Sequence, residues 1–270
     1  MKALRKISAI LLCLVLSLSM CSCSLLGRFK SEPAPETVRI TFPEGTSVIE
    51  TALKLEENGV CTKDEFISAV NDTARESKFV KAIQNPEERP YLLEGYIYPD
   101  TYDFYVGEGA ERALGRFLKN AEAKLTDEMY SRADELGMSM DEIIVLASII
   151  QKEASPEVMA KVSSVLHNRL ESPSYPRLQC DATYLYLKNS VKPYLSEENA
   201  DKYDEFYNTY DCFGLPSGAI TNPGTAAINA ALYPDETEYF FFVTDSDGNY
   251  YFAKTYAEHL KNCKTAGLSD

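Results

Sequence analysis

The sequence predicts an α+β protein, on three observations. Helical patterns dominate the chain, but they do not alternate regularly with strands as the βαβ units of a parallel sheet would. Short runs at residues 38–42 and 238–244 have the composition of strands, and a turn and a further strand follow the second run. The chain has 270 residues, of which 45% are hydrophobic, so it can form one sizeable core and a small additional module.

The charge of the chain argues against some classes of partner. The formal net charge is −14, and no Lys- or Arg-rich run offsets it. Long-range electrostatics would therefore repel nucleic acid and anionic lipid, and we expect no nucleic-acid partner. The 18 Tyr and 12 Phe residues provide stacking surfaces for sugars or peptides.

The chain starts with the layout of an export signal, in which a basic start precedes an apolar run and several cysteines. Residues 1–22 are expected to be a lipoprotein-type signal peptide. Cys23 is then the lipidated residue, because the small Ser22 precedes it, although Cys21 stays open as the alternative. Residues 7–26 could instead form an uncleaved anchor, since they are long enough to cross a bilayer. Both alternatives place the protein on the extracytoplasmic face of the bacterial cytoplasmic membrane.

A polar linker and a small strand–helix–helix unit follow. Residues 23–37 form the linker, and residues 38–42 alternate as a strand. Two helices then begin with capping boxes, in which a Ser or Thr and a Glu three positions later bond each other's backbone N–H. The boxes are Ser47 with Glu50, in a helix that ends at Gly59, and Thr62 with Glu65. The unit over residues 38–72 resembles the LysM-like segment ahead of some cell-wall enzymes, and it would contact glycan or serve for packing.

Further helices are predicted downstream of an aromatic, turn-rich stretch at residues 90–107. Helical periodicity covers residues 111–136 and breaks near Thr126. A capping box of Ser139 with Glu142 starts the next helix. Other helices are expected at residues 156–170, 225–232 and 256–264.

The remaining segments read as loops and a hairpin. Residues 179–188 are short and aromatic, residues 189–207 are polar, and residues 215–224 form a loop with two prolines and two glycines. Strands at residues 238–244 and 249–252 flank a Ser-Asp-Gly turn, which predicts a β-hairpin.

The cysteines outside the export signal are widely spaced, at Cys61, Cys180, Cys212 and Cys263. They form no CxxC or Cys/His ligand pattern, so we expect no metal site and no cofactor. Two disulfides of unspecified pairing and free buried thiols both remain open.

One acidic residue falls on an apolar helix face. Glu153 lies three, four and seven positions after Ile150, Ile149 and Leu146, so it shares their stripe. Apolar neighbours disfavour the charged form and raise the pKa of a carboxyl, which is the state that a general acid needs. The alternative is that the helix ends there and the side chain reaches solvent or a lysine. No GxSxG, HExxH or phosphate-binding glycine loop offers another chemistry.

Eight segments, in order, resemble the MltG/YceG-like endolytic murein transglycosylase family. They read LEGYIYPDTY, LASIIQKEAS, VLHNRL, LQCDATYLY, YNTY, GLPSGAITNPG, YFFFV and TYAEH. The resemblance implies a YceG-like catalytic domain over residues 90–264. The family's catalytic acid is a glutamate in an ASI-x-x-K/R-E motif, which falls on Glu153. Many members have a second glutamate where this chain has Gln151.

The implied reaction is cleavage of the MurNAc–GlcNAc β-1,4 bond in nascent glycan strands to give 1,6-anhydro-MurNAc ends. Glu153 would protonate the leaving oxygen and then accept the proton of the C6 hydroxyl, which closes the anhydro ring. Implied partners are peptidoglycan glycan strands, the membrane through the N-terminal anchor, and peptidoglycan synthases (penicillin-binding proteins). The alternatives are a non-catalytic peptidoglycan-binding scaffold and a hydrolase of the same bond.

The matching motifs also imply substrate-binding residues, whose side chains suit sugar hydroxyls and N-acetyl groups. They are Gln179, Asp181, Asn168, Tyr207, Asn208, Thr209, Asn222 and Glu94. Each could instead have a structural role, as a cap, a core residue or half of an ion pair. The chain departs from the family in its GLPSGA loop, where GLPPGP is usual, and in Tyr250, where a histidine is common.

Overall fold

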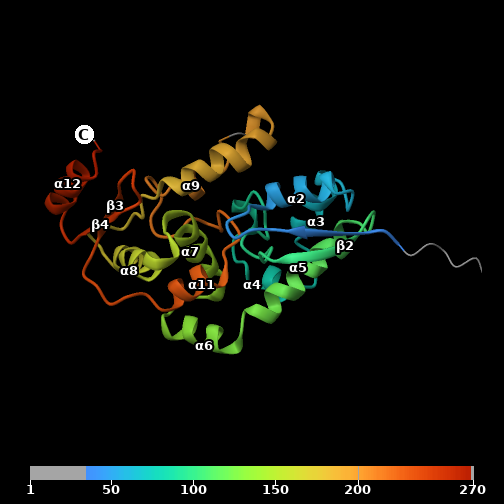
Figure 1. The fold of residues 1–270 in the computed structure, drawn as a ribbon, viewed down its shortest axis with the longest axis horizontal. Coiled ribbons are helices and arrows are strands. Elements are labelled where there is room, and N and C mark those ends of the chain that lie inside the picture. Colours follow the sequence, from blue (N-terminus) through green and yellow to red (C-terminus); the bar gives the residue numbers. More distant parts are fainter. Residues whose placement is uncertain (1–34, 200, 269–270) are drawn as a thin grey trace, which may run out of the picture. The chain divides into compact units, whose positions relative to one another are not determined.

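The structure is a computed structural model that describes residues 35–199 and 201–268. One compact unit extends from Thr37, and it contains every helix and strand named below (Figure 1). It combines helices with two antiparallel two-stranded sheets, which confirms the α+β prediction. The predicted signal peptide and Cys23 lie outside the described residues. Within the described residues, no helix has both the length and the apolar character needed to span a bilayer.

The first sheet joins the start of the unit to a segment about 60 residues later. Strand β1 (Thr37–Thr41) pairs with β2 (Thr101–Tyr105), so that Ile40 lies opposite Tyr102. From the sequence, β2 was predicted only as part of the aromatic, turn-rich stretch at residues 90–107 and not as a strand. In the structure its residues alternate between exposed and buried, as a strand at a surface does. Helices α2 (Val48–Glu57) and α3 (Lys63–Val70) follow β1. The expected LysM-like segment therefore shares a sheet with the range expected for the catalytic domain.

An aromatic core holds these elements together. The ring of Phe117, on α5 (Ala110–Lys124), lies 5.1 Å from Phe42, 4.6 Å from Tyr102 and 6.0 Å from Phe66, measured between centroids. Edge and tilted contacts of this kind add to the free energy gained by burying the rings.

Local signals set the helix boundaries where the sequence predicted them. The three capping boxes that start at Ser47, Thr62 and Ser139 are all present. Thr126 caps α6 (Asp127–Glu135), which is the predicted break in the long helical stretch. Two short helical segments, α4 (Lys78–Ala82) and a 3₁₀ turn (Pro86–Glu88), lead to the aromatic stretch.

Helix α7 (Met140–Glu153) is the central element, and every residue from Ile143 to Ile150 is buried. It packs against α6, α8 (Met159–Leu170), α9 (Asp181–Tyr186) and α11 (Thr225–Leu232), with a 3₁₀ turn (Pro156–Val158) before α8. Gly95 lies against α7 with φ +94°, and a Cβ there would lie 2.6 Å from the Ile144 side chain. Only glycine fits this position.

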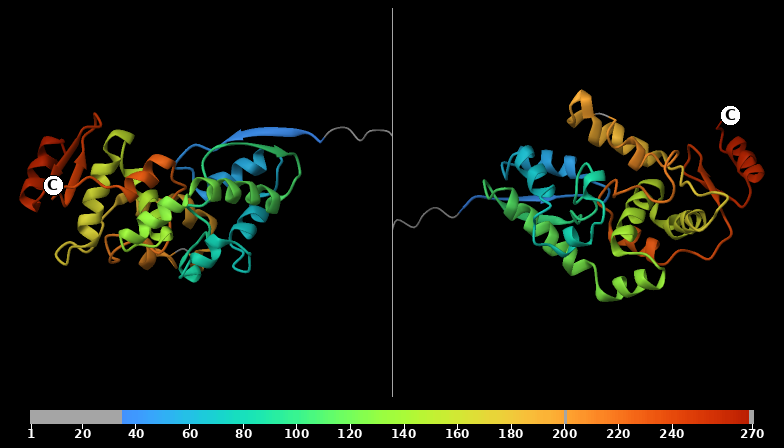
Figure 2. Two further views of the ribbon diagram at one scale, coloured as in Figure 1. Left: turned by 90° about the horizontal axis from the view of Figure 1, so that it is seen from below. Right: turned by 180° about the vertical axis from the view of Figure 1, so that it is seen from behind.

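The C-terminal part forms a hairpin, one strand of which lies beside α8, and a helix that packs on the hairpin (Figures 1 and 2). Strands β3 (Phe241–Thr244) and β4 (Tyr250–Ala253) pair antiparallel, as predicted, and α12 (Tyr256–Thr265) follows. The stretch at residues 189–207, which was described as polar from its sequence, consists largely of short helical turns that follow α9. They are a π-helical turn (Leu187–Val191), two 3₁₀ turns (Lys192–Tyr194, Glu197–Asn199) and α10 (Asp204–Tyr207).

Candidate active site

Glu153 is the last residue of α7, and the backbone that follows it is held by the hairpin. The hydroxyl of Tyr250, on β4, donates to the carbonyl oxygen of Glu153 at 3.0 Å and accepts from the N–H of Ser155 at 3.1 Å. The first bond satisfies one of the carbonyl groups that the end of a helix leaves free, and the second fixes the backbone just beyond the helix. The position of Glu153 therefore depends on a residue almost 100 positions away in the sequence.

The carboxyl group of Glu153 is half-buried and faces the start of α9. Its Oε1 accepts one hydrogen bond, from the N–H of Ala182 at 3.2 Å. Burial raises the pKa of Glu153, the charge of neighbouring Asp181 raises it further, and the Ala182 N–H opposes the rise. Among the ion pairs of the described residues, none includes Glu153. The raised pKa agrees with the expectation from the helical stripe.

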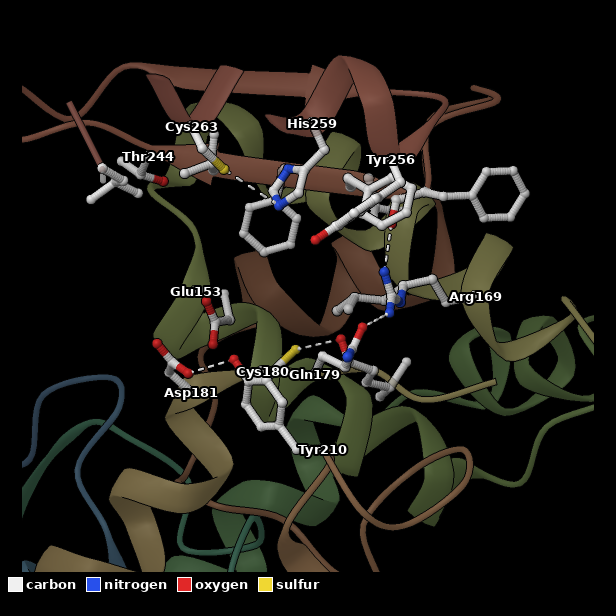
Figure 3. A pocket seen from close by; sticks show the side chains of 18 residues that line it. Glu153, Arg169, Gln179, Cys180, Asp181, Tyr210, Thr244, Tyr256, His259 and Cys263 are labelled. Carbon is white, nitrogen blue, oxygen red and sulfur yellow. Dashed lines mark hydrogen bonds between the residues drawn. The ribbon is translucent and has the colours of Figure 1, made fainter. Parts of the chain in front are cut away.

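Two cavities meet at this carboxyl group. The first, of about 510 Å³, is lined by residues of α8, the start of α9, β3 and α12, and we call it the hairpin cavity (Figure 3). The second, of about 390 Å³, lies between α9 and the loops around Gly45 and Thr221, and we call it the loop cavity. Glu153 and Asp181 line both cavities. A chain-like ligand could thus extend to either side of Glu153.

Gln179 and Asp181 are the predicted binding residues that line the hairpin cavity beside Glu153 (Figure 3). Gln179 has φ +57°, the one described non-glycine residue in the left-handed region, and such strain is typical of functional positions. Arg169 donates to its Oε1, so the amide nitrogen of Gln179 is the free donor. The hydroxyl of Tyr210 donates to Asp181 at 2.7 Å.

The other predicted residues of this region lie outside the lining of both cavities. Thr209 is fully buried, and its Oγ1 accepts from the N–H of Cys180 at 2.9 Å. Asn168 donates to the carbonyl groups of Thr237 and Tyr239 and so joins α8 to the segment before β3. Tyr207 is fully buried, and Asn208 bonds within its own turn. Among these residues Thr209 supports the loop that carries Gln179, because its carbonyl oxygen also accepts from the N–H of Gln179 at 3.0 Å.

Glu94 and Asn222 form a buried network, each is 1% exposed, and neither lines either cavity, although Tyr186, which bonds Glu94, lines the loop cavity. The amide of Asn222 accepts from the N–H groups of Gly95 and Ile97, both at 2.9 Å, and donates to Thr46 and Glu94. Glu94 also accepts from the first N–H of α2 and from the hydroxyl of Tyr186. Burial raises the pKa of Glu94 to about 8, and these donors oppose the rise.

Several cavity residues were not selected from the sequence. Arg169 stands next to Asn168 in the VLHNRL motif. In the sequence, the only indication that it could bind a ligand was that it is an arginine. His259 lines the hairpin cavity and stacks on Phe241, with centroids 5.1 Å apart. In the part of the chain that the structure describes, no three His, Cys, Asp or Glu side chains are grouped as metal ligands.

The cysteines that the sequence left open are free thiols in the structure. Cys180 is buried beside Gln179, and Cys61, Cys212 and Cys263 are half-buried. Burial raises the pKa of the Cys180 thiol well above its ordinary value, so this thiol stays protonated at neutral pH.

Known proteins resemble this chain along most of its length. An endolytic murein transglycosylase of Bacillus subtilis (strain 168) is 29% identical over 252 residues, which cover 88% of this chain and 68% of that protein. An endolytic murein transglycosylase of Streptococcus pneumoniae (strain D39) is 26% identical over 247 residues, which cover 84% of this chain but only 44% of that protein.

A solved structure shares the fold. The crystal structure of a YceG-like protein from Listeria monocytogenes is 30% identical in sequence and superimposes with a TM-score of 0.69, covering 84% of this chain and 75% of that one. The model of the YceG-like family matches residues 15–265. The chain therefore belongs to the YceG-like family.

Proposed function

We propose that this chain is an endolytic murein transglycosylase in which Glu153 is both general acid and general base. The observation that carries the proposal is the position of this half-buried carboxyl group, where two cavities share their lining. An enzyme that cleaves inside a strand must hold sugars on both sides of the bond. The names of the relatives from Bacillus subtilis and Streptococcus pneumoniae support the same activity.

The reaction needs one carboxyl group that changes roles. Protonated Glu153 gives its proton to the glycosidic oxygen as the bond from C1 of MurNAc breaks, and an oxocarbenium-like transition state forms. The C6 hydroxyl oxygen of the same sugar then bonds to C1, and its proton returns to Glu153. The product end is 1,6-anhydro-MurNAc, and no water is consumed. Because the attacking hydroxyl is part of the substrate, it can outcompete water when it is well placed.

Two neighbours suit supporting roles in this step. Asp181 raises the pKa of Glu153 and thereby favours the protonated acid at the start of the reaction. Its carboxylate would also stabilise positive charge on the sugar ring. Gln179, with its amide oxygen engaged by Arg169, would offer N–H groups to an N-acetyl carbonyl. The buried residues Tyr207, Thr209, Asn222 and Glu94, with the partly exposed Asn168 and Asn208, would hold this arrangement in place.

Mass spectrometry of digested peptidoglycan tests the proposal. Isolated glycan strands would be incubated with the wild-type chain, with Glu153→Gln, and with Glu157→Gln as the control, since Glu157 is exposed just beyond α7. Internal fragments with 1,6-anhydro-MurNAc ends are expected from the wild type and the control, and none from Glu153→Gln. Reducing MurNAc ends would make the protein a hydrolase. Binding without cleavage by the wild type would make it a scaffold.

The N-terminal region would place this activity at the membrane. Residues 1–22 would direct export, Cys23 would carry the lipid, and residues 38–72 would serve as a LysM-like glycan contact. Tethering would keep the enzyme near peptidoglycan synthases that produce nascent strands. Metabolic labelling with a radioactive fatty acid tests the lipid anchor in Cys23→Ser beside Cys21→Ser: only Cys23→Ser should lose the label.

A further inference from the structure

Arg169 is a buried cation without an anionic partner. Its residue is 5% exposed, and no carboxylate of the described residues lies within ion-pair distance of its guanidinium. Burying an uncompensated charge is costly, so buried charges in proteins are generally paired. The exception needs an explanation.

Arg89 shows how this fold treats a buried arginine elsewhere. It is 6% exposed, and its guanidinium forms an ion pair with Asp141. Burial alone would lower the pKa of Arg89, but the hydrogen bonds and charge of Asp141 raise it overall. At Arg169 burial lowers the pKa, and no carboxylate counters it. The two arginines are equally buried, and only one has its charge neutralised.

Neutral groups hold the Arg169 side chain from several sides. Nε donates to the carbonyl of Arg177 at 2.8 Å, Nη1 to the carbonyl of Phe240 at 2.9 Å, and Nη2 to the amide oxygen of Gln179. The rings of Tyr175 and Phe241 lie 5.8 and 5.4 Å from its central carbon. A guanidinium has five N–H groups. Three of them are used, so one on each terminal nitrogen remains.

The guanidinium extends from α8 into the hairpin cavity (Figure 3). Among the described residues that line this cavity, Arg169 is the only arginine or lysine, and Glu153 and Asp181 are the only carboxylates. Burial and the charge of Arg169 both lower the pKa of His259, which therefore adds no second positive charge at neutral pH. The cavity thus has one cationic position and, apart from it, one acidic position.

We propose that Arg169 binds a carboxylate group of the muramyl part of the substrate and so sets the register of the glycan at Glu153. The inference rests on the proposed function. Hydroxyl and acetamide groups of the glycan are neutral, whereas muramic acid carries a lactyl carboxyl group, which is either free or linked to a peptide with carboxylates of its own. The carboxylate of Asp181 repels such a group, and Arg169 attracts it with paired N–H donors. Only muramyl sugars would then be drawn to the correct side of the acid.

Binding to chemically defined glycans tests the inference in an inactive background. Calorimetric titration of Glu153→Gln would compare three ligands: neutral chitooligosaccharides, peptide-free muramyl glycan with lactyl carboxylates, and muramyl glycan with peptide stems. The two muramyl glycans would be titrated again after their carboxylates have been converted to amides. At least tenfold tighter binding is expected before amidation than after it, and this preference should weaken as salt is added. If only the peptide-free glycan binds more tightly before amidation, Arg169 binds the lactyl carboxylate. If only the glycan with peptide stems does so, Arg169 binds a carboxylate of the peptide.

Arginine variants provide a second readout. Arg169→Lys should retain part of the preference and Arg169→Gln should lose it, whereas Arg177→Gln is the matched control. Arg177 is outside the cavity lining, with its guanidinium over the ring of Phe213. The comparison of native and amidated glycans uses protein with Arg169 unchanged, so its result does not depend on whether the Arg169 variants fold. Equal binding of native and amidated glycans would overturn the inference but leave the proposed function intact. Failure to bind any glycan would instead remove the proposed function, and the inference with it.

Discussion

Replacing Tyr250 with phenylalanine tests whether the end of α7 must be held for Glu153 to act. The change removes two hydrogen bonds, of 3.0 Å to the Glu153 carbonyl and 3.1 Å from the Ser155 N–H, and keeps the ring that stacks on Phe252. Each neutral bond contributes about 1 kcal/mol net, so together they contribute about 2 kcal/mol. If all of this free energy served to position Glu153 in the transition state, kcat would fall about 30-fold.

Water can replace part of the lost bonding, because Ser155 is exposed. We therefore expect kcat to fall about tenfold, which corresponds to about 1.4 kcal/mol. Since Tyr250 lines neither cavity, KM should change less than threefold. The assay is the initial rate of release of anhydro-ended fragments from glycan strands of defined length.

Tyr251→Phe is the matched control. It removes one hydroxyl from the same strand, a hydroxyl that donates to Asp245 at 3.0 Å and not to α7. Equal values of kcat for Tyr250→Phe and the wild type, with a free energy of unfolding lowered by about 2 kcal/mol, would refute the positioning role. The two bonds would then serve stability alone.

Three further changes have expected outcomes. Asn222→Ala should lower the free energy of unfolding in urea by about 3–5 kcal/mol, because four hydrogen bonds end on that buried amide, against less than about 1.5 kcal/mol for Asn208→Ala. Asp181→Asn should move the alkaline fall of kcat/KM to lower pH, because the Asp181 charge raises the pKa of Glu153, which must be protonated to act. An alkaline fall at the same pH in the variant and the wild type would contradict this. Glu94 has a pKa of about 8 when folded and about 4.5 when unfolded, so its ionisation opposes folding. As pH rises across that interval, wild-type stability should fall relative to Glu94→Gln by up to about 1.4 kcal/mol per pH unit, as measured by denaturation at several pH values.

The sequence predicted those parts of the fold whose causes are local. Each of the three capping boxes depends on two side chains three positions apart, so the residues themselves carry the information. The same holds for Glu153, because helical periodicity places it beside Ile149 and Ile150. The helical pattern singled out this residue but left a solvent-exposed helix end open as the alternative, and the resemblance to the family's ASI-x-x-K/R-E motif selected it as the candidate acid.

Features that depend on distant partners could not be predicted in the same way. Strand β2 pairs with a strand about 60 residues earlier, and its aromatic composition alone did not distinguish a strand from a turn. Asn222 and Glu94 were selected as polar residues in matching motifs, but their burial depends on segments that meet only in the folded chain. Arg169 was missed because a sequence does not show whether a cation has an anionic neighbour.

The Asn222 network also determines when the protein can finish folding during synthesis. Its amide joins Thr46 and the loop at Gly95 and Ile97 to a residue up to 176 positions later. Until residue 222 has emerged, water must hydrate those backbone groups, and closing so long a loop adds an entropic barrier. A nascent chain arrested before this point should stay open to protease around residues 94–97, and one arrested well beyond it should become resistant. Backbone groups at Thr46 and at residues 94–97 would thus remain hydrated until about four fifths of the chain has been made.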